Sequence, residues 1–181
     1  GAMQMKSFEY NILEKIPLAL LIAFASMAYM IFVAFYTPIP GSLENAIMDS
    51  IKTYEEILNT SDFTAILYYH IEQALYTALY LSIPLINVAE YLWRLTIYSW
   101  ATVIEVKMNS LDASKALRSI TNPFSFIHIF LYSFLIIETN SAFINIIRKR
   151  REALLNNALS IAMALSLLIA TTLIGVLLIL T

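Results

Sequence analysis

The feature that most constrains this chain is its alternation of long apolar runs with short polar gaps. A helix needs about 20 residues, rising about 1.5 Å each, to cross a hydrocarbon core roughly 30 Å thick. Four runs have that length, at residues 16–36, 63–85, 123–147 and 154–180. A fifth run, 91–106, is shorter and would span only with snorkelling flanks, or would be re-entrant. The pattern predicts an all-α, polytopic membrane helix bundle of about five transmembrane helices.

The gap after the first run predicts an amphipathic helix over residues 42–59. Its apolar residues recur at helical spacing, and Ser42 is a candidate N-cap. The opposite face is acidic and carries Glu44, Asp49, Glu55 and Glu56. We expect this helix to lie on the external surface of the bundle, in the interface or over its mouth.

The boundaries of the later helices also have local signals. Asp62, with Ser61, is a candidate cap for the second run, and Pro84 should kink or end it. Asn122 followed by Pro123 is the pattern of an N-cap with proline at the first helical position. The polar connection 108–121 has room for about two helical turns.

Composition removes several function classes. With a net charge of −2, the chain lacks the basic stripe that binding a nucleic acid would need. There is no Cys and there are only two His, so neither a disulfide, a cofactor nor a metal site is expected. Three Gly and many Ile, Leu and Tyr suit a thermophile. We treat residues 1–181 as one transmembrane domain, with Gly1, Ala2 and Met3 interpreted as a tag remnant.

The distribution of Lys and Arg predicts the orientation. Residues 148–151 read Arg-Lys-Arg-Arg, which places that connection in the cytoplasm. With five spans, the N-terminus is then cytoplasmic, the C-terminus external and the acidic 38–62 connection external. The 107–121 connection also falls outside, although it carries Lys107, Lys115 and Arg118.

Ionisable side chains at membrane depth are costly, so each is a candidate site. Glu138 stands out because it lies near the middle of its run. It must be neutral, paired or facing water, and Asn87 or Arg94 could be its partner. A structural hydrogen bond and a proton or transport site, with His128 on the same helix, are both open.

Four further candidates belong to the second and third runs. His70 and Glu72 could form a proton relay or an interfacial cluster, and they lack the His-Glu-x-x-His spacing of a zinc protease. Glu90 and Arg94 are four residues apart, in the favourable order for a helical ion pair. An anchoring role at the interface is the simplest interpretation of all four.

Small residues spaced along three runs predict close helix packing. Small-xxx-small rows let helix backbones approach in lipid, where hydrophobicity gives no drive. The predicted packing residues are Ala19, Ala23, Ala74, Ala78, Ser160, Ala164, Thr171 and Gly175.

The order of these features resembles the stage II sporulation protein M family. In that family one helix enters through an Ile-Phe-x-Asn-Asn pattern, and a later one opens with Pro-His-Gly-x-x-Glu. Residues 66–70, Ile-Leu-Tyr-Tyr-His, and 123–128, Pro-Phe-Ser-Phe-Ile-His, stand at these places. The resemblance spans about residues 16–180, with His128 in place of the glutamate. Bacterial members of the family partner cell-wall hydrolases. The family also has archaeal members, and archaea lack that wall, so for them the resemblance implies only a membrane scaffold.

Three function classes follow from these observations. The first is a non-enzymatic membrane subunit that binds partners or copies of itself, with the bilayer as its other partner. The second is a small transporter or channel subunit with a polar path through Glu138 and His128. An intramembrane enzyme is least favoured, because no catalytic motif appears.

Overall fold

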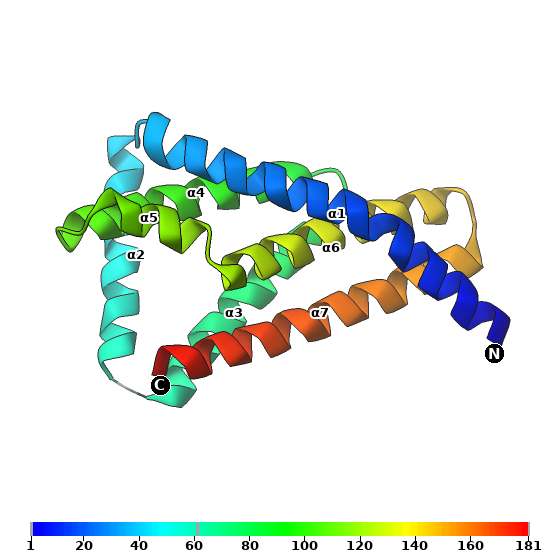
Figure 1. The fold of residues 1–181 in the computed structure, drawn as a ribbon. Coiled ribbons are helices and arrows are strands. Elements are labelled where there is room, and N and C mark those ends of the chain that lie inside the picture. Colours follow the sequence, from blue (N-terminus) through cyan, green and yellow to red (C-terminus); the bar gives the residue numbers. More distant parts are fainter. Residues whose placement is uncertain (1, 61, 181) are drawn as a thin grey trace.

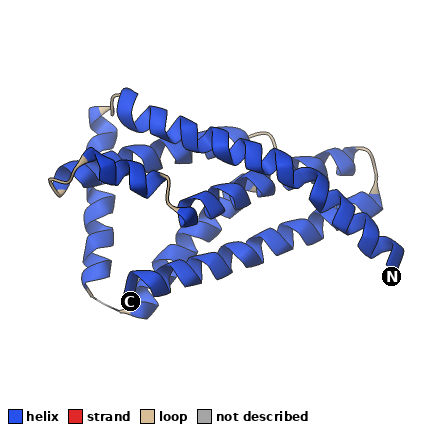
Figure 2. Cartoon of the chain, viewed as in Figure 1, coloured by secondary structure: helices blue, strands red, loops and turns tan. Residues whose placement is uncertain are grey.

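The structure is a computed structural model that describes residues 2–60 and 62–180, with side chains for 12–60 and 62–179. The described residues form helices joined by short turns, with no strand among them (Figure 2). The helices are α1 (Ala2–Tyr36), α2 (Gly41–Asn59), α3 (Phe63–Leu81), α4 (Asn87–Met108), α5 (Ala113–Ile120), α6 (Pro123–Ile147) and α7 (Arg151–Leu180). The predicted tag remnant lies outside this description, because Gly1 is not described and neither are the side chains of Ala2 and Met3.

Three of the described helices are long and apolar enough to cross a membrane. These are Ile12–Tyr36 within α1, Pro123–Ile147, which is α6, and Arg151–Ile179 within α7. The prediction of about five spans is therefore met only in part. The helices α3 and α4 have spanning length but more polar compositions, since α3 contains four Tyr besides His70 and Glu72. The four charged side chains of α4 include Arg94 in its interior.

The long helices pack side by side around one apolar core. The contact between α6 and α7 is the most extensive, and α1 packs on both α6 and α4 (Figure 1). The helix α3 lies against α7. The main core is built from side chains of all these helices, including Met30, Leu81, Leu95, Leu135 and Leu168.

The helix α2 crosses one end of the bundle instead of running along it (Figure 1). Ile47 is buried there in a second core with Val33 of α1 and with Trp100 and Ile104 of α4. The amphipathic pattern of residues 42–59 thus corresponds to a helix with one face packed on α1 and α4.

The helix ends follow most of the local signals. The Asp62 side chain accepts a hydrogen bond from Thr64 N at 2.8 Å, and Asn122 accepts one from Ser125 N at 2.8 Å, so both predicted caps are present. The Ser42 cap is wrong: α2 begins at Gly41, and Pro40 precedes it without a side-chain cap. Proline fixes an extended entry there, and its carbonyl accepts from two amides of the first turn.

Several predicted boundaries move by a few residues. The helix α3 ends at Leu81, before Pro84, because Pro84 disfavours a helical residue before it. The helices α4 and α7 begin at Asn87 and Arg151, earlier than the apolar runs, because polar residues can occupy helix ends. The short α5 fills the predicted two turns in residues 108–121.

Candidate functional site

The candidate site is a polar network where the three candidate spans meet. The Glu138 side chain on α6 is fully buried. Both of its carboxylate oxygens accept hydrogen bonds from Lys15 Nζ of α1, each at 2.9 Å. Asn157 Nδ2 of α7 donates to Oε2 of the same carboxylate. Asn145 Nδ2 extends the network by donating to Asn157 Oδ1 at 2.8 Å. One carboxylate therefore ties α1, α6 and α7 together.

The charges of this network balance. The Lys15 side chain keeps 16% of its surface exposed, whereas Glu138 keeps none. Lys15 lies near the start of its span, so its long side chain reaches from the bundle end to Glu138 while part of it stays exposed. A buried carboxylate is tolerable in an apolar setting when it is paired and hydrogen-bonded, and this one is both.

The suggestion that Asn87 or Arg94 pairs with Glu138 is wrong. Asn87 exchanges hydrogen bonds with Asn140, at 3.3 and 3.4 Å. Arg94 donates to Thr77 Oγ1 at 2.9 Å, and its Nε lies 3.7 Å from Glu90 Oε2. Asn140 is two residues beyond Glu138, which turns it about 200° around α6 and toward α4 rather than toward α1 and α7.

The Glu90–Arg94 pair lies between α3 and α4. Both side chains remain about one-third exposed. The Arg94 guanidinium also lies 5.1 Å from the centre of the Tyr80 ring. The predicted spacing thus brings these two residues together, and α3 supplies Thr77 and Tyr80 as additional contacts.

A second buried polar cluster was not anticipated from the sequence. The Tyr91 hydroxyl of α4 lies 2.8 Å from Ser26 Oγ of α1 and 2.9 Å from Ser133 Oγ of α6. Tyr29 and Thr96 form a similar bridge, also 2.8 Å long. Serine and tyrosine are common in apolar helices, so no sequence signal separates these hydroxyls from those that bond to their own backbone.

The two histidines have different surroundings. His70 Nε2 lies 2.9 Å from the Tyr54 hydroxyl, so it joins α3 to α2. Burial raises the pKa of Tyr54 above its ordinary value of 10.0, and the neighbouring Tyr69 and Glu105 raise it further. His128 Nε2 is buried and has no hydrogen-bond partner among the described residues. Its nearest ring contact is Tyr132, with ring centres 6.3 Å apart.

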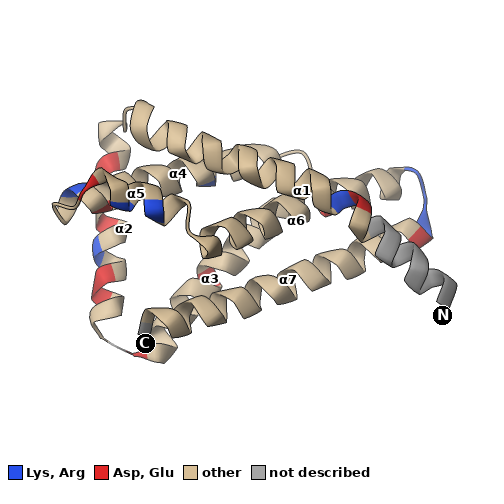
Figure 3. Cartoon of the chain, in the orientation of Figure 1, with Lys and Arg blue, Asp and Glu red and all other residues tan. Residues whose placement is uncertain are grey.

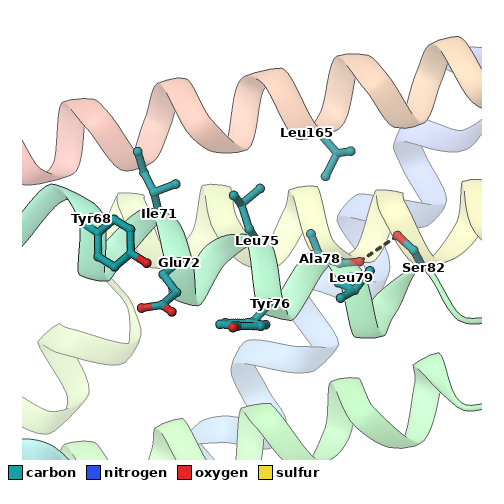
Figure 4. Close-up of a pocket in the computed structure, with 9 residues that line it drawn as sticks. All are labelled: Tyr68, Ile71, Glu72, Leu75, Tyr76, Ala78, Leu79, Ser82 and Leu165. Atoms are coloured by element: carbon teal, nitrogen blue, oxygen red, sulfur yellow. Dashed lines mark hydrogen bonds between the residues drawn. The ribbon is translucent and has the colours of Figure 1, made fainter.

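Glu72 lines a shallow groove of about 530 Å³ along α3 (Figure 4). Most of the lining is apolar or aromatic, including Leu75, Tyr76 and Leu79 from α3 and Leu165 from α7. Glu72 makes no ion pair among the described residues. Neither Glu138 nor His128 lines this groove, and neither lines a second groove at the α1–α2 turn.

The predicted packing residues mostly lie inside the bundle. Ala19 and Ala164 are buried together against Phe134, which joins α1, α7 and α6. The other buried members are Ala23, Ala74, Ala78 and Ser160. Thr171 and Gly175 are only half-buried, and Thr172 is the buried threonine of that turn.

Sequence reasoning missed the residues that complete the Glu138 network. Lys15 stands immediately before the first apolar run, and Asn157 is the last amide before the uninterrupted part of α7. A buried carboxylate that stays ionised needs a partner, and Lys15 directly adjoins a predicted span, as Lys107 and Arg148 do. That requirement was the available signal.

The described groups can hold helices together, but they do not form a metal site. No group of three or more His, Asp or Glu side chains converges among the residues that the structure describes. No family model, curated protein or solved structure matches this chain. The resemblance to the stage II sporulation protein M family thus stays a prediction.

Proposed function

We propose that this chain is a non-enzymatic integral membrane protein that acts as a scaffold, binding partner proteins or copies of itself within the membrane. The observation that carries the proposal is how the Glu138 charge is satisfied. Lys15 and Asn157 occupy the carboxylate from two neighbouring helices. A scaffold needs polar groups that are paired and isolated, whereas a transport path needs them to converge on a continuous cavity.

The other buried polar groups support the same function. The Asn87 and Asn140 amides bond to each other, and Tyr91 bonds to two serines. Each set joins two or three helices, which favours a rigid bundle. The resemblance to the stage II sporulation protein M family would also fit a scaffold.

We propose further that α3 and α4 enter the membrane as a hairpin, which gives five membrane helices in all. The turn between them lies at the depth of Asn140, because Asn87 at the start of α4 bonds to Asn140. Asn140 is seven residues before the end of α6, so the turn falls short of that end by about 10 Å. A hairpin that enters and returns leaves both termini on the sides that five spans require.

The proposed orientation has a cytoplasmic N-terminus and an external C-terminus. The basic residues of the α6–α7 turn lie at one end of the molecule, and the acidic residues of α2 lie at the opposite end (Figure 3). This separation supports the assignment of the basic end to the cytoplasm. The helix α2, with exposed Asp49 and Glu56, would then offer an acidic external surface to partners.

The alternative is a small transporter or channel subunit, and one observation favours it. His128 Nε2 is a buried polar atom without a described hydrogen-bond partner. A group that passes protons along a path would also lack a fixed partner. His128 lies on α6 with Glu138, but ten residues separate them, which is about 15 Å along the helix.

Flux measurements in liposomes separate these two functions. For a scaffold we expect purified protein, reconstituted at known density, to carry no proton or ion flux above empty liposomes. A robust flux that is lost in Glu138→Gln and in His128→Phe, with both variants still folded, would overturn the scaffold proposal. Glu56→Gln on the surface of α2 is the matched control and should behave like the wild type.

A further inference from the structure

The turn between α6 and α7 concentrates positive charge. Arg148, Lys149, Arg150 and Arg151 are consecutive, and all four are exposed. None of them takes part in an ion pair with a described carboxylate. Glu152 is the only acidic residue in the first turn of α7.

The backbone of this turn has a defined conformation. Lys149 has a φ of 55°, the left-handed conformation that ends many helices. Arg150 N donates to Asn145 O at 2.9 Å, and Lys149 N donates to Ile146 O at 3.1 Å. These two bonds close the end of α6, so the basic residues lie on a defined turn instead of a long loop.

The electrostatics of the turn favour a bound anion. Four like charges on adjacent residues repel one another. Arg150 and Arg151 also stand at the start of α7, where the amide dipoles of a 30-residue helix favour negative charge. Arg148, the C-cap of α6, is favoured by the dipole of that helix. The turn would therefore gain from a bound anion.

The surroundings of the turn indicate where that anion resides. Exposed apolar side chains flank the basic residues on both helices: Ile144, Ile146 and Ile147 are 46%, 57% and 64% exposed, and Leu155 is 55% exposed. Both helices are candidate spans, so these side chains suit acyl chains. A cationic turn directly above such a band lies at headgroup level.

We propose that residues 148–151 form a binding site for the headgroup of an anionic phospholipid. The phosphate would accept hydrogen bonds from the guanidinium groups, which match phosphate oxygens in pairs. The acyl chains would lie along Ile144, Ile147 and Leu155. Bound lipid would brace the α6–α7 contact close to the Glu138 network.

Lipid binding to the whole protein in neutral detergent tests this site. Native mass spectrometry would count dioleoyl phosphatidylglycerol and dioleoyl phosphatidylcholine bound to the wild type and to a variant with all four residues replaced by Gln. We expect the wild type to bind phosphatidylglycerol at least about tenfold more tightly than phosphatidylcholine, with the preference falling as salt screens the charges. The fourfold variant should lose the preference.

Two controls define what would overturn the proposal. The variant Lys107→Gln, Lys115→Gln, Arg118→Gln removes three cations from the other end of the molecule and should keep the preference. Equal loss there, or an unchanged preference in the fourfold variant, would contradict the site. If the fourfold variant fails to fold, the milder double variant Arg148→Gln, Arg150→Gln replaces it. This double variant should lose part of the preference for phosphatidylglycerol. Displacement of the lipid by millimolar inorganic phosphate would assign the turn to free anions instead.

Discussion

At the residue scale, the charge of Glu138 requires polar partners inside the bundle. The carboxylate has no exposed surface, so its pairing with Lys15 and Asn157 replaces the hydration it lost. Removing one partner of such a pair leaves a charge that is poorly solvated. Replacing both partners with apolar groups removes the problem and can be nearly neutral.

We therefore predict that Glu138→Leu lowers the free energy of unfolding by about 3 kcal/mol, the low end of the range for a broken buried pair. Lys15 retains some exposure and can turn toward the bundle end, which limits the loss. The double variant Lys15→Met, Glu138→Leu should regain most of it. Unfolding in mixed detergent micelles, arranged as a double-mutant cycle, measures both values. Additive losses would mean that the two side chains do not interact.

Leu85 is a second residue with a direct effect on stability, because its backbone is strained. Its φ is 75°, which is unfavourable for a side chain with a Cβ, and the side chain is 82% exposed. We predict that Leu85→Gly stabilises the protein by about 0.5–1 kcal/mol, because glycine relieves the strain and little packing is lost. Leu85→Ala keeps the strain and should give no gain, and a shift in melting temperature distinguishes the two. A gain with alanine as large as with glycine would refute the backbone explanation.

At the element scale, small residues set how closely the spans approach. Ala19 of α1 and Ala164 of α7 are both buried against Phe134 of α6, so three helices meet where two of them carry only a methyl group. Lipid provides no hydrophobic drive for this contact, and close packing has to supply the stability.

We predict that Ala164→Leu costs about 1–3 kcal/mol, because the larger side chain must push α1 or α6 away. Ala162 lies on the exposed face of the same helix, so Ala162→Leu is the matched control and should be nearly neutral. Thermal unfolding in detergent compares the two substitutions made in one helix. Equal effects from both would show that Ala164 has no special packing role.

At the scale of the whole molecule, one end carries the basic α6–α7 turn and the other carries both the acidic α2 and the basic residues of α4 and α5. The basic α6–α7 turn and the acidic α2 lie apart along the bundle, as Figure 3 shows. In the proposed orientation α2 and the start of α6 lie outside, so the proposed α3–α4 hairpin returns to the side from which it enters. Its return leaves α1, α6 and α7 as the crossings that fix the sidedness of both termini.

We predict that a single cysteine at position 49 reacts with an impermeant maleimide added to intact cells, and that one at position 150 reacts only after permeabilisation. This 181-residue chain has no Cys, so each label reports one site. The reverse labelling would invert the proposed topology. Labelling of both positions from outside would show that an odd number of crossings does not separate them.

The sequence by itself determined the elements of this protein. The apolar run 123–147 predicted both ends of α6 correctly, because Asn122 and Pro123 mark its start and a basic turn follows its end. The amphipathic spacing of 42–59 likewise predicted α2, since that period depends only on local geometry. Composition did not settle α3 and α4, whose polar and aromatic residues are compatible with a span or with a covered helix.

Only the tertiary structure decided which polar groups meet. Glu138 and Lys15 are 123 positions apart, and Tyr91 and Ser26 are 65 apart, so no local pattern relates them. The sequence required that a buried carboxylate have a partner, but several side chains qualified and the wrong ones were favoured. The rotation of α6 about its own axis determines the partners: Glu138 faces α1 and α7, while Asn140 faces α4. That rotation is set by the packing of the apolar core as a whole.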